Sequence, residues 1–306
     1  MAQRLIDLAI IGAGPAGLAA AIYAARSGID ALTFEGMQGS QLSTTDLVEN
    51  YPGFAEGVSA PELLDAMRRQ AVNQGAKFEM DEIESVDFAG GRKILRGMTD
   101  EYAARSVVIA TGARARWLGS PGEEQYKRRG VSACATCDGA FFKGKEVAVI
   151  GGGDSALSEA IYLSRLASKV TVVHRRDRFR ATEALQKRVA ELENVALCMG
   201  DTPAAFEGDG RALSSIALSG GGRLEVSGAF VAIGHEPVTG FLKGSVALDA
   251  GGYVKTDSRQ MTDVPGVFAA GDCADPLYRQ AIVAAGRGAA AAIEAYSFLQ
   301  NQGDRK

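Results

Sequence analysis

The chain has 306 residues, of which 46% are hydrophobic and 23% are charged, and its formal net charge is −4. This composition indicates a globular protein of one large or two ordinary domains and excludes intrinsic disorder. A slightly acidic chain has no general attraction to nucleic acid, and four cysteines are too few for a disulfide framework, so we expect a reducing, cytoplasmic environment.

An uncharged stretch over residues 8–25 has the position of a signal-peptide core or a membrane span. It contains three glycines and a proline, however, and the basic residue ahead of it, Arg4, is offset by Asp7. A turn between a strand and a helix explains these glycines and a membrane helix does not. We therefore expect neither secretion nor insertion into a membrane.

The same stretch predicts a nucleotide-binding unit. A strand over residues 6–11 leads into a GxGxxG turn, and an apolar helix follows to Arg26. In this pattern the first glycine permits the tight turn, the second lets a pyrophosphate approach the backbone, and the third lets the helix pack against the strand. The helix N-terminus offers its N–H groups to the phosphates. The residues concerned are Gly12, Gly14, Pro15, Ala16 and Gly17.

The next strand, residues 29–34, ends in Glu35. An acid at this distance beyond the glycines binds ribose hydroxyls and repels a 2′-phosphate. The first site is therefore expected to hold FAD or NAD. After it, residues 36–54 are polar and irregular, and Ser59 is expected to cap a helix that runs to residue 73.

Three short strands, near residues 77–80, 83–88 and 93–98, predict a β-meander. A further strand over residues 103–110 ends in Ala110, Thr111 and Gly112, a second turn of small residues beside a nucleotide.

Two cysteines with two residues between them follow, Cys134 and Cys137, with Asp138 directly behind. Such a short loop stabilises little as a disulfide, so redox chemistry is the better interpretation. A carboxylate opposes thiolate formation but can exchange protons with a thiol during disulfide exchange. A zinc site would need further ligands, and the candidates, Cys198, Cys273, His174 and His235, are scattered along the chain.

A second nucleotide-binding unit begins with a strand over residues 146–150, a glycine turn and a helix to residue 167. Its next strand, residues 169–173, ends in a basic cluster where the first unit has an acid. Arginines at this position are suited to a 2′-phosphate, which predicts NADP(H) here and FAD in the first unit. The turn contributes Gly151, Gly153, Asp154, Ser155 and Ala156, and the cluster His174, Arg175, Arg176 and Arg180.

The remaining elements complete both units. A helix from Thr182 to residue 193 and strands near 195–199, 214–219, 224–226 and 228–233 extend the second unit. A late apolar strand ends in Gly271 and Asp272, and this acid is placed to accept hydrogen bonds from the ribityl hydroxyls of a flavin. A final helix over residues 279–299 could direct its N-terminus at the flavin C2 carbonyl. The C-terminal part is thus expected to fold back onto the first unit.

With these motifs assembled, the chain resembles bacterial thioredoxin reductases of the low-molecular-weight type over nearly its whole length. The resemblance rests on GAGPAG, ENYPG, ATGARA, GVSACATCDG, GGGDSA, HRRDRFRA, AIGHEP and GVFAAGD, in matching order and spacing. It implies two Rossmann-like dinucleotide-binding domains, the second inserted into the first. Residues 1–113 and 244–306 would bind FAD, and residues 114–243 would bind NADPH and carry the dithiol. It also implies a homodimer that reduces thioredoxin.

The resemblance further implies roles for single residues. Cys137 would lie nearest the flavin, Cys134 would attack the protein substrate, and Asp138 would manage the thiolate's proton. Arg129, in a basic run over residues 127–129, would help recruit the partner. Further flavin contacts would be Gly36, Gln41, Leu42, Asn50, Arg279, Gln280 and Ala281.

Two positions depart from the family pattern: Ser40 stands where glycine is frequent, in a loop at residues 36–41 that is shorter than usual, and Ala140 stands where an aromatic residue is frequent. Three alternative functions remain open: a flavin-dependent dithiol oxidase, a reductase of another protein disulfide carrier, and a non-catalytic redox sensor. The order of the motifs also predicts a hinge rotation of the middle domain about two crossings, near residues 113–117 and 240–244, because one rigid arrangement would have to serve NADPH, the dithiol and a protein substrate.

Overall fold

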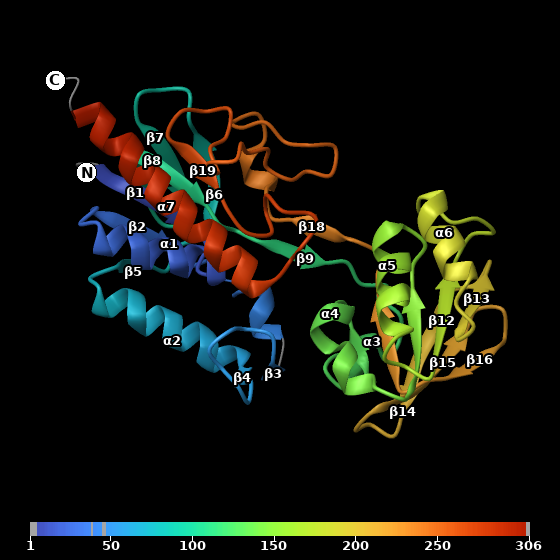
Figure 1. Ribbon diagram of the computed structural model, residues 1–306. Coiled ribbons are helices and arrows are strands. Elements are labelled where there is room, and N and C mark those ends of the chain that lie inside the picture. Colours follow the sequence, from blue (N-terminus) through green and yellow to red (C-terminus); the bar gives the residue numbers. More distant parts are fainter. Residues whose placement is uncertain (1–4, 38, 45–46, 304–306) are drawn as a thin grey trace. The chain divides into compact units, whose positions relative to one another are not determined.

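The chain alternates between two units (Figure 1). Unit 1 comprises Met1–Arg114 and Glu236–Lys306, and unit 2 comprises Ala115–His235. The computed structural model describes residues 5–37, 39–44 and 47–303. Both units are α/β and built on parallel strands, which confirms the predicted fold class.

The sheet of unit 1 is centred on β1 (Leu5–Ile11), which pairs in parallel with β2 (Ala31–Phe34) on one side and β8 (Glu101–Ile109) on the other. Beyond β8, β7 (Lys93–Gly97) and β6 (Ile83–Asp87) continue the sheet in antiparallel order. The predicted meander therefore holds for β6 and β7, and β8 continues it.

The first strand assigned to that meander lies elsewhere. Strand β5 (Lys77–Glu79) pairs in parallel with β2, at the opposite edge of the sheet. It follows α2 (Ala60–Asn73), so β2, α2 and β5 form a crossover that returns the chain in parallel, as βαβ connections do. The assignment of residues 77–80 to the meander was wrong. The helix ahead of them brings the chain back across the sheet, so the strand that follows runs parallel to β2.

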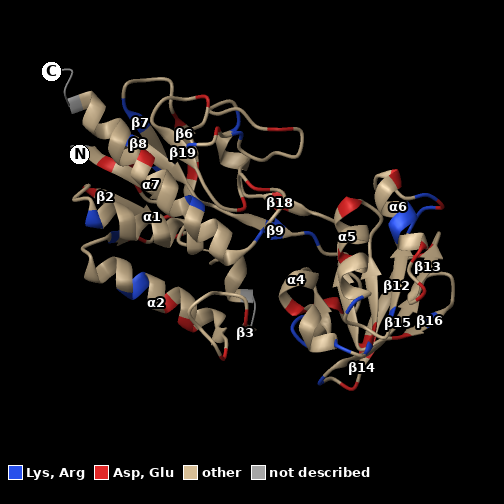
Figure 2. Cartoon of the chain, in the orientation of Figure 1, with Lys and Arg blue, Asp and Glu red and all other residues tan. Residues whose placement is uncertain are grey.

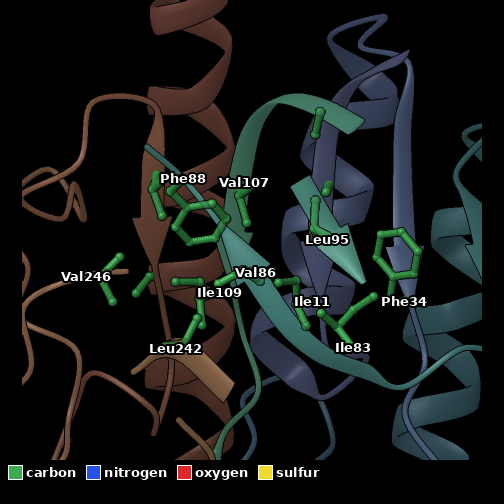
Figure 3. Close-up of a cluster of buried hydrophobic side chains, with 14 of the residues drawn as sticks. Ile11, Phe34, Ile83, Val86, Phe88, Leu95, Val107, Ile109, Leu242 and Val246 are labelled. Carbon is green, nitrogen blue, oxygen red and sulfur yellow. The ribbon is translucent and has the colours of Figure 1, made fainter. Parts of the chain in front are cut away.

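Alternate residues of β1 enter two separate cores. Leu8 and Ile10 face the helices α1 (Pro15–Arg26) and α7 (Ala281–Gly303), where they meet a layer rich in alanine. Ala9 and Ile11 face the other side, where Phe34, Leu95 and Ile109 belong to the same cluster (Figure 3). A strand covered on both faces is apolar throughout, which explains its unbroken hydrophobic run.

The C-terminal segment belongs to unit 1. Strand β19 (Val267–Ala269) pairs in parallel with β8, and α7 packs along α1 (Figure 1). Gly288 makes this close packing possible, because a Cβ there would lie 2.0 Å from the carbonyl oxygen of Ala16. The first and last parts of the chain thus meet at the start of α1.

Short elements complete unit 1. The 3-10 helix η1 (Gln41–Thr44) precedes the antiparallel pair β3 (Leu47–Val48) and β4 (Val58–Ser59). Ser59 caps α2 as expected: its hydroxyl accepts from the Glu62 amide, and the Glu62 carboxylate accepts from the Ser59 amide. This reciprocal pair satisfies two N–H groups that a helix start otherwise leaves open.

Unit 2 is built on a five-stranded sheet in which each neighbouring pair is parallel. The helices α5 (Asp154–Leu163) and α6 (Glu183–Ala190) share one apolar cluster with one face of β11. The opposite face of β11 belongs to a second apolar cluster, which it shares with a three-stranded antiparallel sheet. In order across the main sheet, the strands are β10 (Val131–Ser132), β17 (Gly228–Val231), β11 (Glu146–Ile150), β12 (Lys169–His174) and β13 (Val195–Met199); the second sheet contains β14 (Pro203–Gly208), β15 (Leu213–Leu218) and β16 (Arg223–Glu225).

The two chain crossings between the units pair with each other. They are β9 (Ala113–Ala115) and β18 (His235–Pro237), which form a two-stranded ribbon that the sequence did not predict. The second crossing also lies earlier than the expected residue 243. The segment after it contains the 3-10 helix η3 (Gly240–Leu242), and Leu242 is fully buried in the core of unit 1.

Over the described ranges, no helix combines the length and the apolar character that crossing a bilayer requires.

Candidate redox and nucleotide sites

The dithiol lies in unit 2, between β10 and a short helical turn. Cys134 and Cys137 are joined as a disulfide with their Cα atoms 5.3 Å apart, and α4 (Ala135–Asp138) begins directly after Cys134. The Asp138 amide donates to the Cys134 carbonyl oxygen at 3.1 Å, which closes this turn. Ala135 is fully buried and anchors the turn, whereas both cysteines are partly exposed. The disulfide is therefore held firmly but remains accessible.

Close packing behind the turn fixes its position. The 3-10 helix η2 (Gly139–Phe142) follows α4, and a Cβ on Gly139 would lie 3.1 Å from both the Leu163 and the Tyr162 side chains of α5. A larger residue would push the dithiol turn away from α5. The glycine after Asp138 is thus a packing requirement of the redox turn.

Ser132 joins the acid to the disulfide loop. Its hydroxyl lies 2.5 Å from Asp138 Oδ2, and it accepts from the Cys134 amide at 3.0 Å. The sequence analysis did not identify this residue, although a serine two positions ahead of the CxxC was visible. Thr136 lies on the exposed side of the loop, with its Oγ1 3.4 Å from Cys134 Sγ.

In unit 1, the first glycine turn has the close contacts that the pattern predicts. Gly12 has φ +107°, and a Cβ on Gly17 would lie 1.8 Å from the Gly12 carbonyl oxygen. Gly14 is the N-cap of α1 and has no side chain with which to satisfy the first amides of the helix. Within the part of the chain that the structure describes, and apart from Gly14's own helix and chain neighbours, an added Cβ on Gly14 would have only Ser40 within 4 Å, with its Oγ at 3.2 Å. This space suits a diphosphate at the helix N-terminus.

Glu35 follows β2, where an adenosine ribose is expected. Its carboxylate accepts from Arg68 of α2 at 2.9 Å through Nε and at 3.1 Å through Nη2. Arg68 also lies over the Phe78 ring, 4.6 Å from its centroid. The sequence gave no signal for Arg68, because it lies far from Glu35 along the chain. A ribose bound at this site would donate hydrogen bonds to the same Glu35 carboxylate that accepts from the Arg68 guanidinium.

Asp272 stands at the carboxyl end of β19, beside α1. A Cβ on the preceding Gly271 would lie 2.9 Å from the Ala16 side chain, so this strand end meets the start of α1. The pKa of Asp272 is raised to about 6, chiefly by burial and also by the neighbouring charge of Asp275, against the opposing effect of Arg279 and Arg287. Such a carboxyl is stabilised in its charged form by hydrogen-bond donors, which a polyhydroxyl chain would provide.

The loop ahead of α7 is extensively hydrogen-bonded. Asp275 is buried, accepts from the amides of Leu277 and Tyr278, and pairs with Arg287 at 3.0 Å. Asn50 donates to Gln280 at 3.1 Å and so connects this loop to the segment after η1. Helix α7 begins at Ala281, two residues after the expected Arg279, which has φ +48° and donates to the Pro276 carbonyl.

The other residues expected at the first site lie on the loops at the carboxyl ends of β2 and β8. Thr111 donates to the Val238 carbonyl at 2.7 Å, and Gly36 packs against Glu82. Gln41 and Leu42 begin η1. Gln38, within the shortened loop at 36–41, lies outside the described residues. Unit 1 thus brings together turns from both ends of the chain that fit a dinucleotide.

In unit 2, the ring of His174 packs against the second glycine turn. A Cβ on Gly152 would lie 2.3 Å from the His174 ring, and the Arg180 amide donates to the Gly152 carbonyl oxygen at 2.8 Å. Asp154 accepts from the Thr182 amide at 2.8 Å, so Thr182 is held by its backbone and makes no side-chain cap. These bonds connect the turn to the segment after β12.

His174 differs from the arginines that follow it. It is buried, its ring stacks on Phe179, and its Nε2 lies 3.1 Å from the Arg178 carbonyl oxygen. Burial lowers the pKa of His174, and the nearby arginines lower it further. The ring therefore lies against the turn and supports it, and the direct contact of His174 with the cofactor that the sequence predicts stays a prediction.

The arginines Arg175, Arg176 and Arg180 are exposed on this segment, which Figure 2 shows beside α6. They present cationic groups at the carboxyl end of β12, next to the glycine turn. This arrangement fits a dinucleotide with an additional phosphate.

Comparison with known proteins identifies the group to which these sites belong. Residues 6–288 match the family described as pyridine nucleotide-disulphide oxidoreductase. A thioredoxin reductase of Mycolicibacterium smegmatis is 47% identical over 306 residues, which cover 98% of each chain. The chain belongs to the thioredoxin reductases of this family.

Other thioredoxin reductases extend the comparison. One from Rickettsia conorii is 46% identical over 300 residues, covering 95% of this chain and 97% of its own. A protein of Mycobacterium leprae named bifunctional thioredoxin reductase/thioredoxin is 46% identical, with 99% of this chain and 68% of its own covered.

Solved structures agree with this assignment. Thioredoxin reductase from Giardia duodenalis has a TM-score of 0.93 at 41% identity, covering 97% of this chain and all of that one. The Lactococcus lactis enzyme, in what is described as its FR conformation, has a TM-score of 0.65 at 40% identity, covering 97% and 99%. As a member of the thioredoxin reductases, the chain is an oxidoreductase whose Cys134–Cys137 pair is the redox-active disulfide.

Proposed function

We propose that this protein transfers electrons from NADPH, through FAD bound by unit 1, to the Cys134–Cys137 disulfide and then to oxidised thioredoxin. The observation that carries the proposal is in unit 2. One unit holds an accessible disulfide, an adjacent acid, and a glycine turn with exposed arginines. A dithiol oxidase or a redox sensor has no need of that basic nucleotide site.

The contacts of each cofactor follow from the two turns. For FAD we propose Gly12, Gly14, Pro15, Ala16, Gly17, Glu35, Gly36, Gln41, Leu42, Asn50, Ala110, Thr111, Gly112, Gly271, Asp272, Arg279, Gln280 and Ala281. For NADPH we propose Gly151, Gly153, Asp154, Ser155, Ala156, His174, Arg175, Arg176 and Arg180. Bound FAD would supply the two-electron chemistry that couples a nicotinamide to a disulfide.

The chain's own residues would perform the disulfide exchange. The Cys134 thiolate attacks one sulfur of the substrate disulfide, and the other sulfur leaves as a thiolate that takes a proton from Asp138. Cys137 then attacks Cys134, releases the second substrate sulfur and restores the enzyme disulfide. One NADPH and one proton thus convert one protein disulfide into two thiols.

Thioredoxin is the proposed acceptor because the similar proteins are named for it. The Mycobacterium leprae protein combines the two names in one chain. A reductase of another protein disulfide carrier would use the same chemistry, so only the acceptor distinguishes this second candidate.

We also propose that the protein is a homodimer, as the resemblance implies. Tyr23 of α1 and Ile293 of α7 are 44% and 49% exposed, which gives unit 1 apolar side chains that a second copy could cover. Sedimentation at twice the mass of the chain is expected, and a monomer would refute this part.

Anaerobic titration of the purified holoenzyme with NADPH tests the main proposal. We expect loss of flavin absorbance with NADPH and its return on addition of oxidised thioredoxin. Reoxidation by oxygen alone, at a rate equal to that with thioredoxin, would favour the dithiol oxidase. A panel of other oxidised carrier proteins, compared by kcat/KM, identifies a different natural acceptor.

In the same preparation, Cys137→Ser is expected to trap thioredoxin as a mixed disulfide through Cys134. In Cys134→Ser, Cys137 is expected to remain unable to trap it. Trapping through Cys137 would reverse the assigned roles of the two sulfurs.

A further inference from the structure

The hydroxyl of Ser132 makes three polar contacts in one small space. Ser132 ends β10 and is buried. Its Oγ lies 3.0 Å from the Cys134 amide nitrogen, 2.5 Å from Asp138 Oδ2 and 3.4 Å from the Cys134 carbonyl oxygen. It therefore touches both the acid and the backbone of the first cysteine.

The chemistry of these partners fixes where the hydroxyl proton points. The Cys134 amide can only donate, so Ser132 Oγ accepts there. The single hydroxyl proton then has two possible acceptors, the carboxylate and the carbonyl. An ionised carboxylate only accepts, and the 2.5 Å separation has the length of a charge-assisted O–H···O⁻ bond. With Asp138 ionised, the proton thus points at Asp138.

Protonation of Asp138 reverses this bond without moving a heavy atom. The carboxylic O–H can donate to the second lone pair of Ser132 Oγ, and the serine proton turns to the Cys134 carbonyl oxygen. Asp138 would give up a proton in one exchange and regain it later. Its partner must therefore be able to hydrogen-bond with both the carboxylate and the carboxylic acid.

We propose that Ser132 is a positioning residue that keeps Asp138 beside the dithiol in both protonation states, by rotating one hydroxyl proton between Asp138 and the Cys134 carbonyl. The inference rests on the proposed role of Asp138 as the proton donor of the exchange. Ser132 itself exchanges no proton and forms no bond with sulfur. When the leaving thiolate takes the proton of Asp138, the serine proton turns back to the new carboxylate.

A disulfide exchange that depends on this proton can be compared with one that does not. The holoenzyme is reduced with dithiothreitol, separated from it, and mixed with a small disulfide while the Cys134–Cys137 disulfide re-forms. Hydroxyethyl disulfide releases a basic alkyl thiolate that needs a proton. An aromatic disulfide, dithiobis(nitrobenzoic acid), releases a thiolate that is stable without one. Neither reaction needs NADPH or thioredoxin.

For Ser132→Ala we expect about a tenfold slower reaction with the alkyl disulfide and a change of less than about twofold with the aromatic one. Ser132→Thr keeps the hydroxyl and should restore the alkyl rate to within about threefold. Ser120→Ala is the matched control, because Ser120 is a half-buried serine of the same unit whose hydroxyl donates to the Pro203 carbonyl at 3.1 Å. It should leave both rates unchanged.

Equal slowing with both disulfides in Ser132→Ala would mean that the serine only holds the loop, and it would overturn the inference. So would an unchanged alkyl rate. Because these rates are measured without a protein acceptor, they decide the role of Ser132 whether or not wild-type protein reduces thioredoxin. If Ser132→Thr does not fold, the ratio of the two rates in Ser132→Ala still decides.

Discussion

At the scale of single residues, we expect the exposed arginines of unit 2 to determine which nicotinamide cofactor the protein prefers. We expect Arg175→Ala combined with Arg176→Ala to raise the KM for NADPH roughly tenfold or more, because charge-assisted hydrogen bonds to a 2′-phosphate are lost. The KM for NADH should change little. Steady-state kinetics with both cofactors measure this difference.

Arg178→Ala is the control for that pair. Arg178 lies on the same exposed segment, and its carbonyl oxygen lies 3.1 Å from His174 Nε2. It should leave the NADPH/NADH ratio near that of wild type. Equal effects of the double substitution on both cofactors would contradict the 2′-phosphate assignment.

We expect Asp272 to make flavin affinity dependent on pH. Without cofactor, burial raises its pKa to about 6, so the carboxyl is largely protonated below that pH. Hydrogen bonds from ribityl hydroxyls favour the ionised form and lower the pKa in the complex. Binding below pH 6 must therefore release a proton, and FAD affinity should fall as the pH decreases from 7 to 5, by up to about tenfold per unit.

Fluorescence titration of the apoprotein with FAD measures this dependence directly. In Asp272→Asn the slope between pH 5 and 7 should flatten, because the proton-linked group is gone. Asp275→Asn is a poor substitute, since Asp275 also pairs with Arg287 and holds the loop before α7. An unchanged slope in Asp272→Asn would assign the linkage to another group.

Ser40, which the sequence analysis expects to depart from the family pattern, has its Oγ 3.2 Å from where a Cβ on Gly14 would lie. The Leu42 amide donates to Ser40 Oγ at 3.2 Å, which leaves the hydroxyl proton to donate to a phosphate. We expect Ser40→Ala to weaken binding of ADP to the apoprotein about three- to tenfold and to leave adenosine binding unchanged. Ser43→Ala, in the same loop, is the control, and calorimetry with both ligands is the measurement.

At the scale of elements, local patterns predicted the strands and turns that carry the nucleotide motifs. Strand β1, the GxGxxG turn and α1 follow from adjacent residues, and the close contacts of Gly12 and Gly17 match the role given to each. The β9–β18 ribbon and β14 were not predicted. Their pairing depends on partners distant in the chain, which a local pattern does not contain.

The same distinction applies to the sites. The sequence identified the dithiol, Asp138 and the arginines, because their chemistry is visible in adjacent positions. It also gave His174 a direct cofactor contact, which stays a prediction, and it did not predict that the ring packs under Gly152. Arg68 and Ser132 were missed because their roles come from hydrogen bonds that only the folded chain shows.

The segment after α3 (Glu123–Tyr126) offers a test of partner recruitment. Lys127 pairs with Glu124 and lies 4.1 Å from the centroid of the Trp117 ring, whereas Arg129 donates to the Gly210 carbonyl oxygen at 3.2 Å. We expect Arg129→Glu to lower kcat/KM for an acidic thioredoxin several-fold and to reduce its dependence on salt. Reduction of ferricyanide by NADPH should not change.

Arg92→Glu makes the same charge change in the exposed loop between β6 and β7 of unit 1, so it controls for net charge. Comparison of both variants over a range of ionic strength separates local recruitment from general electrostatics. If ferricyanide reduction falls as much as thioredoxin reduction in Arg129→Glu, the arginine is structural.

At the scale of the whole molecule, the proposed reaction makes three demands that conflict. A nicotinamide must approach the flavin to roughly 3–3.5 Å for hydride transfer, the disulfide must also reach the flavin, and Cys134 must then meet a whole protein. Solved thioredoxin reductases of nearly equal identity have TM-scores of 0.93 and 0.65 to this chain, so members of the group differ in overall arrangement. We therefore expect unit 2 to rotate about the β9–β18 ribbon during turnover.

Two glycines with left-handed backbones flank this ribbon, Gly112 with φ +73° and Gly234 with φ +105°. Apart from its chain neighbours, a Cβ at either position would have none of the described residues within 4 Å, so we expect an alanine there to act through its backbone preference. We expect Gly234→Ala to slow thioredoxin turnover several-fold, because the hinge loses conformations. The dissociation constants of FAD and NADPH should remain near those of wild type.

Gly221→Ala is the matched control. Gly221 has φ +88° and similarly open surroundings, and it lies in the β15–β16 hairpin of unit 2. If both alanine variants slow turnover equally, the effect is one of local strain. A chemical cross-link that joins the two units and leaves turnover normal would show that the rotation is unnecessary.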